Sequence, residues 1–328
     1  MDRTTLIAFS VLSALSAGFA CANSSKPEAQ DDVKKATQAS AGFDQAASWQ
    51  YLLKQCNFGP RKPGTPAHIQ CRDWIKAEME KNGCTNVRLQ PFAHTWSMTR
   101  QKVQMWNIIG EQNWQNAKVR VVLLAHWDTR PTADQEFDEK KMMTPIIGAN
   151  DGASGVAVLL ELMKHTKALH PDLGFQFLMT DGEDLGPGLD EMFLGAAAYA
   201  KDYGQHKPNY GILLDMIGDK DLEVPMEPQS NFYAKPLVSA FYSFMKKNGY
   251  ESTYPSFFGP TIEDDHIPLN KAGIPTMDLI DFSYPSWHTL DDTPDKCSAE
   301  SLGKIGKSLL KWFSQPQPWA YPNRNSQE

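Results

Sequence analysis

Cysteine is scarce in this chain of 328 residues, which contains five, and no two of them stand in a C-x-x-C spacing. This absence argues against a zinc site built from cysteine thiolates. One of the five, Cys21, follows an apolar N-terminal run, and the other four are Cys56, Cys71, Cys84 and Cys297. For these four the sequence leaves open free buried thiols or one or two structural disulfides.

Positive charge is also limited. The chain has 32 Lys and Arg against 39 Asp and Glu, a formal net charge of −7, and no basic stripe. We therefore expect no nucleic acid among its partners. Hydrophobic residues make up 41% of the chain, which is typical of a packed globular core.

The apolar run at the N-terminus, residues 6–20, is too short to cross a bilayer comfortably. Its position predicts an export signal over residues 1–21. Two processing routes stay open. Gly18-Phe19-Ala20 before Cys21 resembles a bacterial lipoprotein box, with a lipid on Cys21 anchoring the protein to a membrane, whereas Ala20-Cys21-Ala22 fits a cleavage site that releases a soluble protein. We expect an exported protein, either periplasmic in a bacterium or anchored as a lipoprotein.

Internal repeats and Gly/Ser linkers are missing from residues 45–315, which predicts one domain. Residues 22–44 are rich in Ser, Lys, Asp, Gln and Ala and predict a flexible tether. Residues 316–328 are rich in Pro and Asn and predict a tail on the surface.

Helical and strand patterns alternate along the domain. Helices are predicted over residues 45–55, 67–82, 153–170, 191–201, 236–248 and 299–313. Strands are predicted over residues 87–92, 103–109, 119–125, 175–180, 210–215 and 274–280. The alternation predicts the α/β class, with a central, mostly parallel, mixed and twisted sheet and helices on both faces.

Polar clusters follow three of the predicted buried strands. His126 and Asp128 follow the strand over 119–125, Asp181-Gly182-Glu183-Asp184 follows the strand over 175–180, and Asp215 ends the strand over 210–215. In open α/β sheets, ligands bind beyond the carboxyl ends of strands. Histidine and carboxylate ligands meeting there suit a catalytic Zn²⁺.

Each cluster also has an ordinary structural interpretation. His126 and Asp128 could form a satisfied polar pair, and Asp151, in Asn150-Asp151-Gly152, could cap the following helix. The small residues around Asp151 instead favour close approach of backbone to a ligand. The carboxylates of residues 181–184 could form a solvated turn, but a metal bound by Asp184 beside a base would relieve their mutual repulsion.

Two further clusters lie in predicted loops, Asp264-Asp265-His266-Ile267-Pro268 and Trp287-His288-Thr289. A large aromatic side chain beside a histidine is what a pocket wall requires.

The order His-x-Asp, Asn-Asp-Gly, Gly-Glu-Asp, Leu-Asp-Met-Ile-Gly and Trp-His-Thr along the chain resembles that of the M28 zinc peptidase superfamily, over roughly residues 45–315. Within it, the chain is similar to the glutaminyl-peptide cyclotransferase (glutaminyl cyclase) family of the animal and bacterial type. The resemblance implies an M28-like catalytic domain that converts the N-terminal glutamine of peptides and proteins to pyroglutamate and releases ammonia.

The resemblance also implies site roles. It implies one zinc ion, with ligands Asp151, Asp184 and His288. It implies that Glu183 is the general acid and base. Its carboxylate partners would be Asp264 and Asp215. The substrate side chain would lie near Trp287 and Asp278.

The chain departs from the animal cyclases at two of these positions. Asp184 stands where they have Glu, and Asp278 stands where they have His near the substrate. The shorter Asp184 still offers a metal ligand, and Asp278 could still hydrogen-bond the ammonia group.

A two-zinc aminopeptidase of the same superfamily is the main alternative. Its five ligand positions are filled here by His126, Asp151, Asp184, Asp215 and His288. The stretch from Asp264 to Pro268, together with Trp287, favours the cyclase. A non-catalytic binding lipoprotein would have lost a ligand or the base, and none is missing. The charged loop over residues 132–144 is expected to rim the pocket.

Overall fold

The computed structural model describes residues 42–317 and Ala320. The predicted export signal with Cys21, nearly all of the tether and nearly all of the tail lie outside the described residues. Within the described part, no helix is both long and apolar enough to span a membrane. Phe43, at the end of the predicted tether, is only 3% exposed, and its ring packs where any side chain at Gly306 would have to lie. The packed body therefore includes Phe43.

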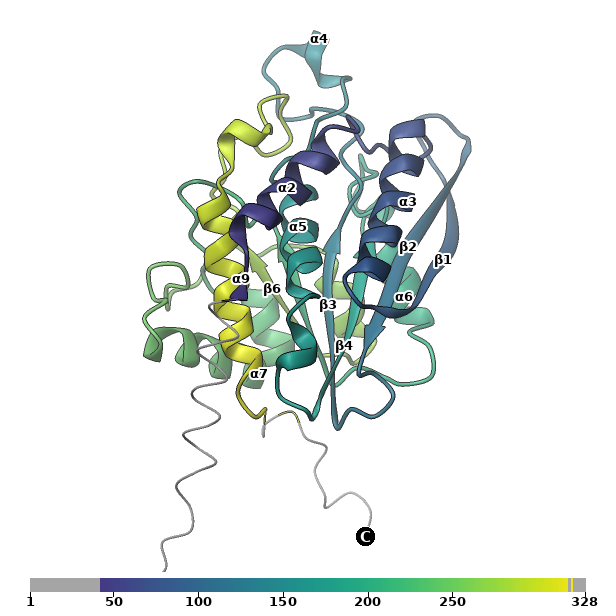
Figure 1. Ribbon diagram of the computed structural model, residues 1–328. Helices are drawn as coiled ribbons and strands as arrows, with labels where there is room; N and C mark the ends of the chain where they lie inside the picture. Colours follow the sequence, from purple (N-terminus) through teal and green to yellow (C-terminus); the bar gives the residue numbers. More distant parts are fainter. Residues whose placement is uncertain (1–41, 318–319, 321–328) are drawn as a thin grey trace, which may run out of the picture.

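The centre of the molecule is a six-stranded sheet with the strand order β1-β2-β4-β3-β5-β6 (Figure 1). The strands are β1 Thr85–Thr95, β2 Lys102–Gln112, β3 Val119–His126, β4 Leu173–Thr180, β5 Tyr210–Asp215 and β6 Thr276–Ile280. Strands β4, β3, β5 and β6 are parallel, whereas β1 and β2 pair antiparallel at one edge. The predicted mixed sheet is confirmed.

Helices cover both faces of this sheet. On one face α2 Gln45–Cys56, α5 Ala153–Leu162 and α9 Ala299–Phe313 pack together (Figure 1). On the other face α6 Leu194–Lys201 packs on α8 His266–Lys271. The remaining helices are α3 Pro66–Lys81, which packs on β1 and β2, α7 Pro228–Lys247, which packs on β6, and the short α4 Glu139–Met142.

The alternation of side chains along β3 explains why both faces are covered. Val121 and Leu123 belong to the larger apolar core, whereas Val122 and Leu124 belong to the smaller one behind the sheet. All four are fully buried. A strand that is apolar at every position needs a covering layer on each side, because leaving either set in water would forfeit its hydrophobic stabilisation.

Two helix predictions need correction, and one short helix was missed. The helix predicted over 153–170 ends at Leu162, because the Met163 carbonyl accepts bonds from the Gln112 amide and the Thr166 hydroxyl instead of continuing the helix. The helix predicted over 236–248 begins earlier, at Pro228, and is kinked at Ala234, two residues before Pro236. The short α8 was not predicted, since it spans only six residues.

Of the two alternatives for the cysteines, free thiols or disulfides, the structure shows free thiols. Within the described residues, the structure contains no disulfide, and the four cysteines are free and buried: Cys56, Cys71, Cys84 and Cys297.

Candidate active site

The polar clusters meet at the carboxyl ends of the parallel strands. His126 is the last residue of β3, Asp215 is the last residue of β5, and Asp184 lies four residues beyond the end of β4. Asp151 comes just before α5, and His288 comes from the loop after β6. All five side chains are nearly excluded from solvent. The structure thus brings together both the predicted zinc ligands and the two candidates for a second metal.

His288 joins the two carboxylates of the first ligand set. Its Nε2 lies 3.2 Å from Asp184 Oδ1 and 3.5 Å from Asp151 Oδ2. Zinc bonds of about 2.0–2.2 Å, arranged in a tetrahedron, place ligand atoms roughly 3.3–3.6 Å apart. Asp151 Oδ2 and Asp184 Oδ2 are buried and have no hydrogen-bond partner among the described residues. Unpaired, buried carboxylate oxygens beside an imidazole nitrogen fit a cation held between them.

His126 has a different environment. Its Nε2 lies 3.1 Å from Asp215 Oδ1, in a hydrogen bond, and 3.1 Å from Asp151 Oδ1. These separations are those of direct N–H···O contacts. The same Asp215 oxygen also accepts the Met216 N–H. His126, Asp151 and Asp184 nevertheless offer ligand atoms that lie within 4.8 Å of one another, so His126 borders the metal site.

Glu183 lies beside His126, with 6% of its surface exposed. Its Oε2 is 3.7 Å from His126 Nδ1. Burial and the negative charges of Asp184 and Asp264 raise the pKa of Glu183 well above its usual value, although His126 opposes the shift. A carboxyl group with a raised pKa can both take up and release a proton near neutral pH.

A second group of buried polar side chains lies beside Glu183. Asp264, His266 and Asp278 place potential ligand atoms within 4.8 Å of one another. Burial and neighbouring carboxylates raise the pKa of both Asp264 and Asp278. Both oxygens of Asp278 lack a hydrogen-bond partner within the described residues. They are therefore able to accept hydrogen bonds from a polar substrate group.

Trp287 lies directly against the predicted metal ligand. Its ring stacks on the His288 ring with 4.0 Å between centroids and contacts the Phe282 ring at 4.9 Å. Trp287 therefore lies beside the predicted ligand, and its role as a pocket wall stays a prediction.

Asp151 does not cap α5. The N-cap residue is Gly152, with a positive φ of 98°, and no side chain caps this end. A Cβ on Gly152 would lie 2.6 Å from the Asp128 carbonyl oxygen, so this close approach requires glycine. The Asp151 carboxylate is therefore left free to point into the site, and the capping interpretation is wrong.

Two aspartates fix the backbone of the ligand loops. Asp128 accepts the N–H groups of both Glu183 and Asp184 at 3.2 Å. It lies 3.8 Å from His126 Nδ1, which is longer than a hydrogen bond. Asp292 accepts the N–H groups of Asn150 at 2.8 Å and of Asp151 at 3.1 Å. The sequence analysis missed Asp292, because nothing in its local pattern indicates a bond to residues about 140 positions away.

Asp134 was also missed as a site residue. One of its oxygens lies 2.9 Å from His288 Nδ1, and the other accepts a bond from Arg130 at 2.6 Å. Arg130 in turn lies 3.4 Å from Asp184 Oδ1. A metal-bound histidine usually donates its second ring N–H to a carboxylate. A carboxylate partner for His288 was therefore to be expected, but the sequence does not show which residue provides it.

The chain is similar to known proteins over most of its length. The profile described as Peptidase family M28 matches residues 107–313. The chain is similar to the solved structure of Bacteroides thetaiotaomicron glutaminyl cyclase bound to N-acetylhistamine, with 33% identity, a TM-score of 0.79, and coverage of 84% of this chain and 99% of that one. It is also similar to a Zn-dependent exopeptidase from Parabacteroides distasonis, with 32% identity, a TM-score of 0.78, and coverage of 84% and 99%.

A more distant likeness links the chain to an animal enzyme. The glutaminyl-peptide cyclotransferase of Bos taurus is 23% identical over 325 residues, which cover 85% of this chain and 84% of that protein.

Proposed function

Since the chain belongs to peptidase family M28, we propose that it acts as a glutaminyl-peptide cyclotransferase. It would convert the N-terminal glutamine of peptides and proteins to pyroglutamate and release ammonia. Similar proteins with this activity in their names match the chain over most of their length. The buried Asp264, whose charge acts on Glu183, supports the same choice over an aminopeptidase.

One zinc ion is part of this proposal, held by Asp151, Asp184 and His288. The observation that carries it is the pair of unpaired, buried oxygens on Asp151 and Asp184. His126 and Asp215, the additional ligands of a two-zinc site, already bond each other. The side chain of Asp184 is shorter than that of Glu but still long enough to bind the zinc ion, because its Oδ1 lies 3.2 Å from His288 Nε2.

The zinc ion, when bound, would polarise the γ-carbonyl group of the substrate glutamine and stabilise negative charge on its oxygen. Glu183 takes a proton from the substrate α-amine, whose nitrogen then forms a bond to the γ-carbonyl carbon. The C–N bond to the amide nitrogen breaks, and Glu183 returns the proton to the departing ammonia. The attack is intramolecular, so holding the amine and the amide in place supplies much of the acceleration.

The neighbouring groups serve this proton transfer. The negative charge of Asp264 raises the pKa of Glu183, which makes Glu183 a stronger base toward the amine, and Asp215 positions His126 beside it. Asp278 has free oxygens for the amine or the departing ammonia. Trp287 would form the wall along the glutamine side chain.

Two peptides test the proposal, one beginning with Gln and one beginning with Leu. The protein should release ammonia from the first without cutting a peptide bond and should leave the second intact. Release of free Leu, with two zinc ions per chain by metal analysis, would instead establish the aminopeptidase.

We also propose export, supported by the apolar run before Cys21. Detergent phase separation of the protein made in a Gram-negative host distinguishes the two processing routes. A lipoprotein enters the detergent phase and leaves it in a Cys21→Ser variant, whereas a released periplasmic protein stays in the aqueous phase. Full-length protein in the cytosol would argue against export.

A further inference from the structure

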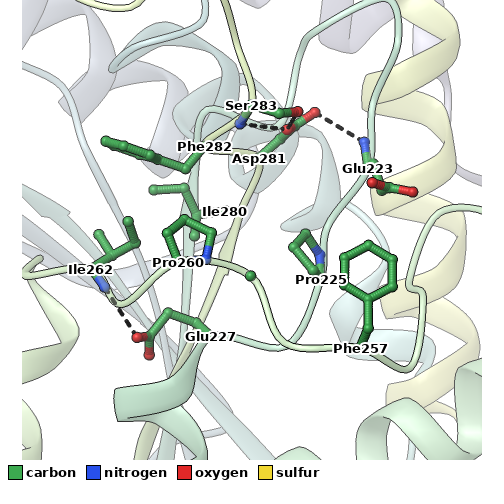
Figure 2. A pocket seen from close by; sticks show the side chains of 11 residues that line it. Glu223, Pro225, Glu227, Phe257, Pro260, Ile262, Ile280, Asp281, Phe282 and Ser283 are labelled. Carbon is green, nitrogen blue, oxygen red and sulfur yellow. Dashed lines mark hydrogen bonds between the residues drawn. The ribbon is translucent and has the colours of Figure 1, made fainter.

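A cavity of about 140 Å³ lies beside the aromatic pair Phe282 and Trp287, with Phe282 in its lining. Figure 2 shows Pro225 and Phe257 on one side of it and Ile262, Ile280 and Phe282 on the other. Phe257 is 50% exposed, so the cavity has an apolar rim that solvent reaches. Neither the proton transfer nor the zinc site uses this space.

The cavity shares a wall with the proposed glutamine site. The Phe282 ring, which lines it, contacts Trp287, and Trp287 stacks on His288. The two ring-to-ring steps measure 4.9 and 4.0 Å. An extended peptide advances about 3.3 Å per residue. The Phe282 ring therefore lies within about 9 Å of the His288 ring, a separation that an extended peptide spans by its third or fourth residue.

The charge of the lining is entirely negative. It includes the carboxylates of Glu223, Glu227 and Asp281, and none of the described lining residues is Lys, Arg or His. Asp281 accepts bonds from the N–H groups of Glu223 and Ser283, and Glu227 caps the start of α7. The side chain of Glu223 is exposed and forms no hydrogen bond or ion pair with any described residue.

We infer that this cavity is a subsite for the side chain of a lysine or arginine at the third or fourth position of the peptide substrate. The aliphatic part of such a side chain would pack against Phe257 and Pro225, and its cation would reach Glu223. The inference rests on the proposed function, because it places the N-terminal glutamine at the metal ligands.

Peptides of matched length test the subsite. Gln-Ala-Lys-Ala and Gln-Ala-Ala-Lys amides are compared with the corresponding Glu peptides and with Gln-Ala amide, which is too short to reach the cavity. At low salt, at least one Lys peptide should have a KM about fivefold lower than its Glu counterpart, as expected for an exposed charge interaction. The difference should shrink in 0.5 M salt, because salt screens exposed charges.

Two variants locate the effect. Glu223→Gln keeps the size of the side chain and removes its charge, so it should abolish most of the Lys preference while leaving the KM for Gln-Ala amide unchanged. Glu300→Gln, at an exposed glutamate on α9 that does not line the cavity, should keep the preference.

The outcomes separate the two proposals. Equal KM values for the Lys and Glu peptides, or a preference that survives Glu223→Gln, would overturn the subsite and leave the cyclase intact. Failure to cyclise every Gln peptide, including the dipeptide, would overturn the proposed function itself.

Discussion

The three carboxylates that follow β4 have three different environments. Asp181 lies 2.9 Å from His68 Nε2 and accepts the Trp106 N–H. Although burial opposes it, His288 and Arg130 hold the pKa of Asp184 below its usual value. Burial and Asp184 raise the pKa of Glu183. The repulsion expected from the sequence is thus relieved in two ways, with cations beside Asp184 and a proton available to Glu183.

Glu183→Gln should remove turnover and keep the metal. The amide cannot carry the proton between amine and ammonia, so kcat should fall by at least about 10²-fold, a typical contribution of a general base. Zinc content by metal analysis and the melting temperature should match the unchanged protein. Substantial residual cyclisation by a fully loaded variant would contradict the assigned role.

Asp134→Asn should weaken metal binding without unfolding the protein. The change removes the negative charge beside His288 Nδ1, and loss of such a partner typically costs 10–100-fold in metal affinity. Competition with a zinc chelator measures the affinity directly. Asp138→Asn is the matched control, since Asp138 lies in the same loop but only caps α4. Equal affinities in the two variants would show that Asp134 does not support His288.

At the scale of elements, the loop over residues 132–144 is fastened to the His288 segment. The Gln135 N–H donates to the His288 carbonyl, and Glu136 accepts the Leu290 N–H at 3.0 Å. The outer half of the loop is free of such bonds to the site and presents Phe137, 104% exposed, and Met143, 64% exposed. This division supports the expectation that the loop rims the pocket.

Replacing residues 137–143 by a short Gly/Ser link tests that expectation. The inner half with Asp134 and Glu136 is kept, so zinc affinity should not change. Loss of an apolar contact of roughly 1 kcal/mol should raise KM for long Gln peptides about fivefold. Steady-state kinetics with several peptides provide the measurement. Unchanged KM values across all of them would mean that the outer half does not meet the substrate.

For the whole molecule, the buried cysteines predict a chain that resists thiol reagents until it unfolds. Burial raises the pKa of Cys56 to about 11 and of Cys71 and Cys84 to about 12, and it also raises the pKa of Cys297. Only the thiolate reacts quickly, so these four thiols should not react with thiol reagents at pH 8 while the protein is folded.

A colorimetric thiol count should give no reactive group from these four in the folded protein and all four in denaturant. A Cys21→Ser background removes any contribution from the N-terminus. Fast reaction in the folded state would mean that the core around these buried thiols opens readily.

The sequence by itself determined where the strands lie and which polar clusters follow them along the chain. The apolar stretch of β3 requires cover on both faces, and a polar residue at its end, His126, then has to lie at the sheet edge. Helix ends were less determined, because the stop at Leu162 depends on Gln112, about 50 positions away. The roles of the site residues stay predictions until the variants are measured.

Only the tertiary structure decided which groups support the ligands. Asp134 reaches His288 across 154 positions, and Asp292 reaches the Asp151 backbone across 141. A buried polar group must find a partner, but the chain order does not say which loop will supply it. That choice is made when the loops pack over the strand ends, which local patterns of hydrophobicity and charge do not encode.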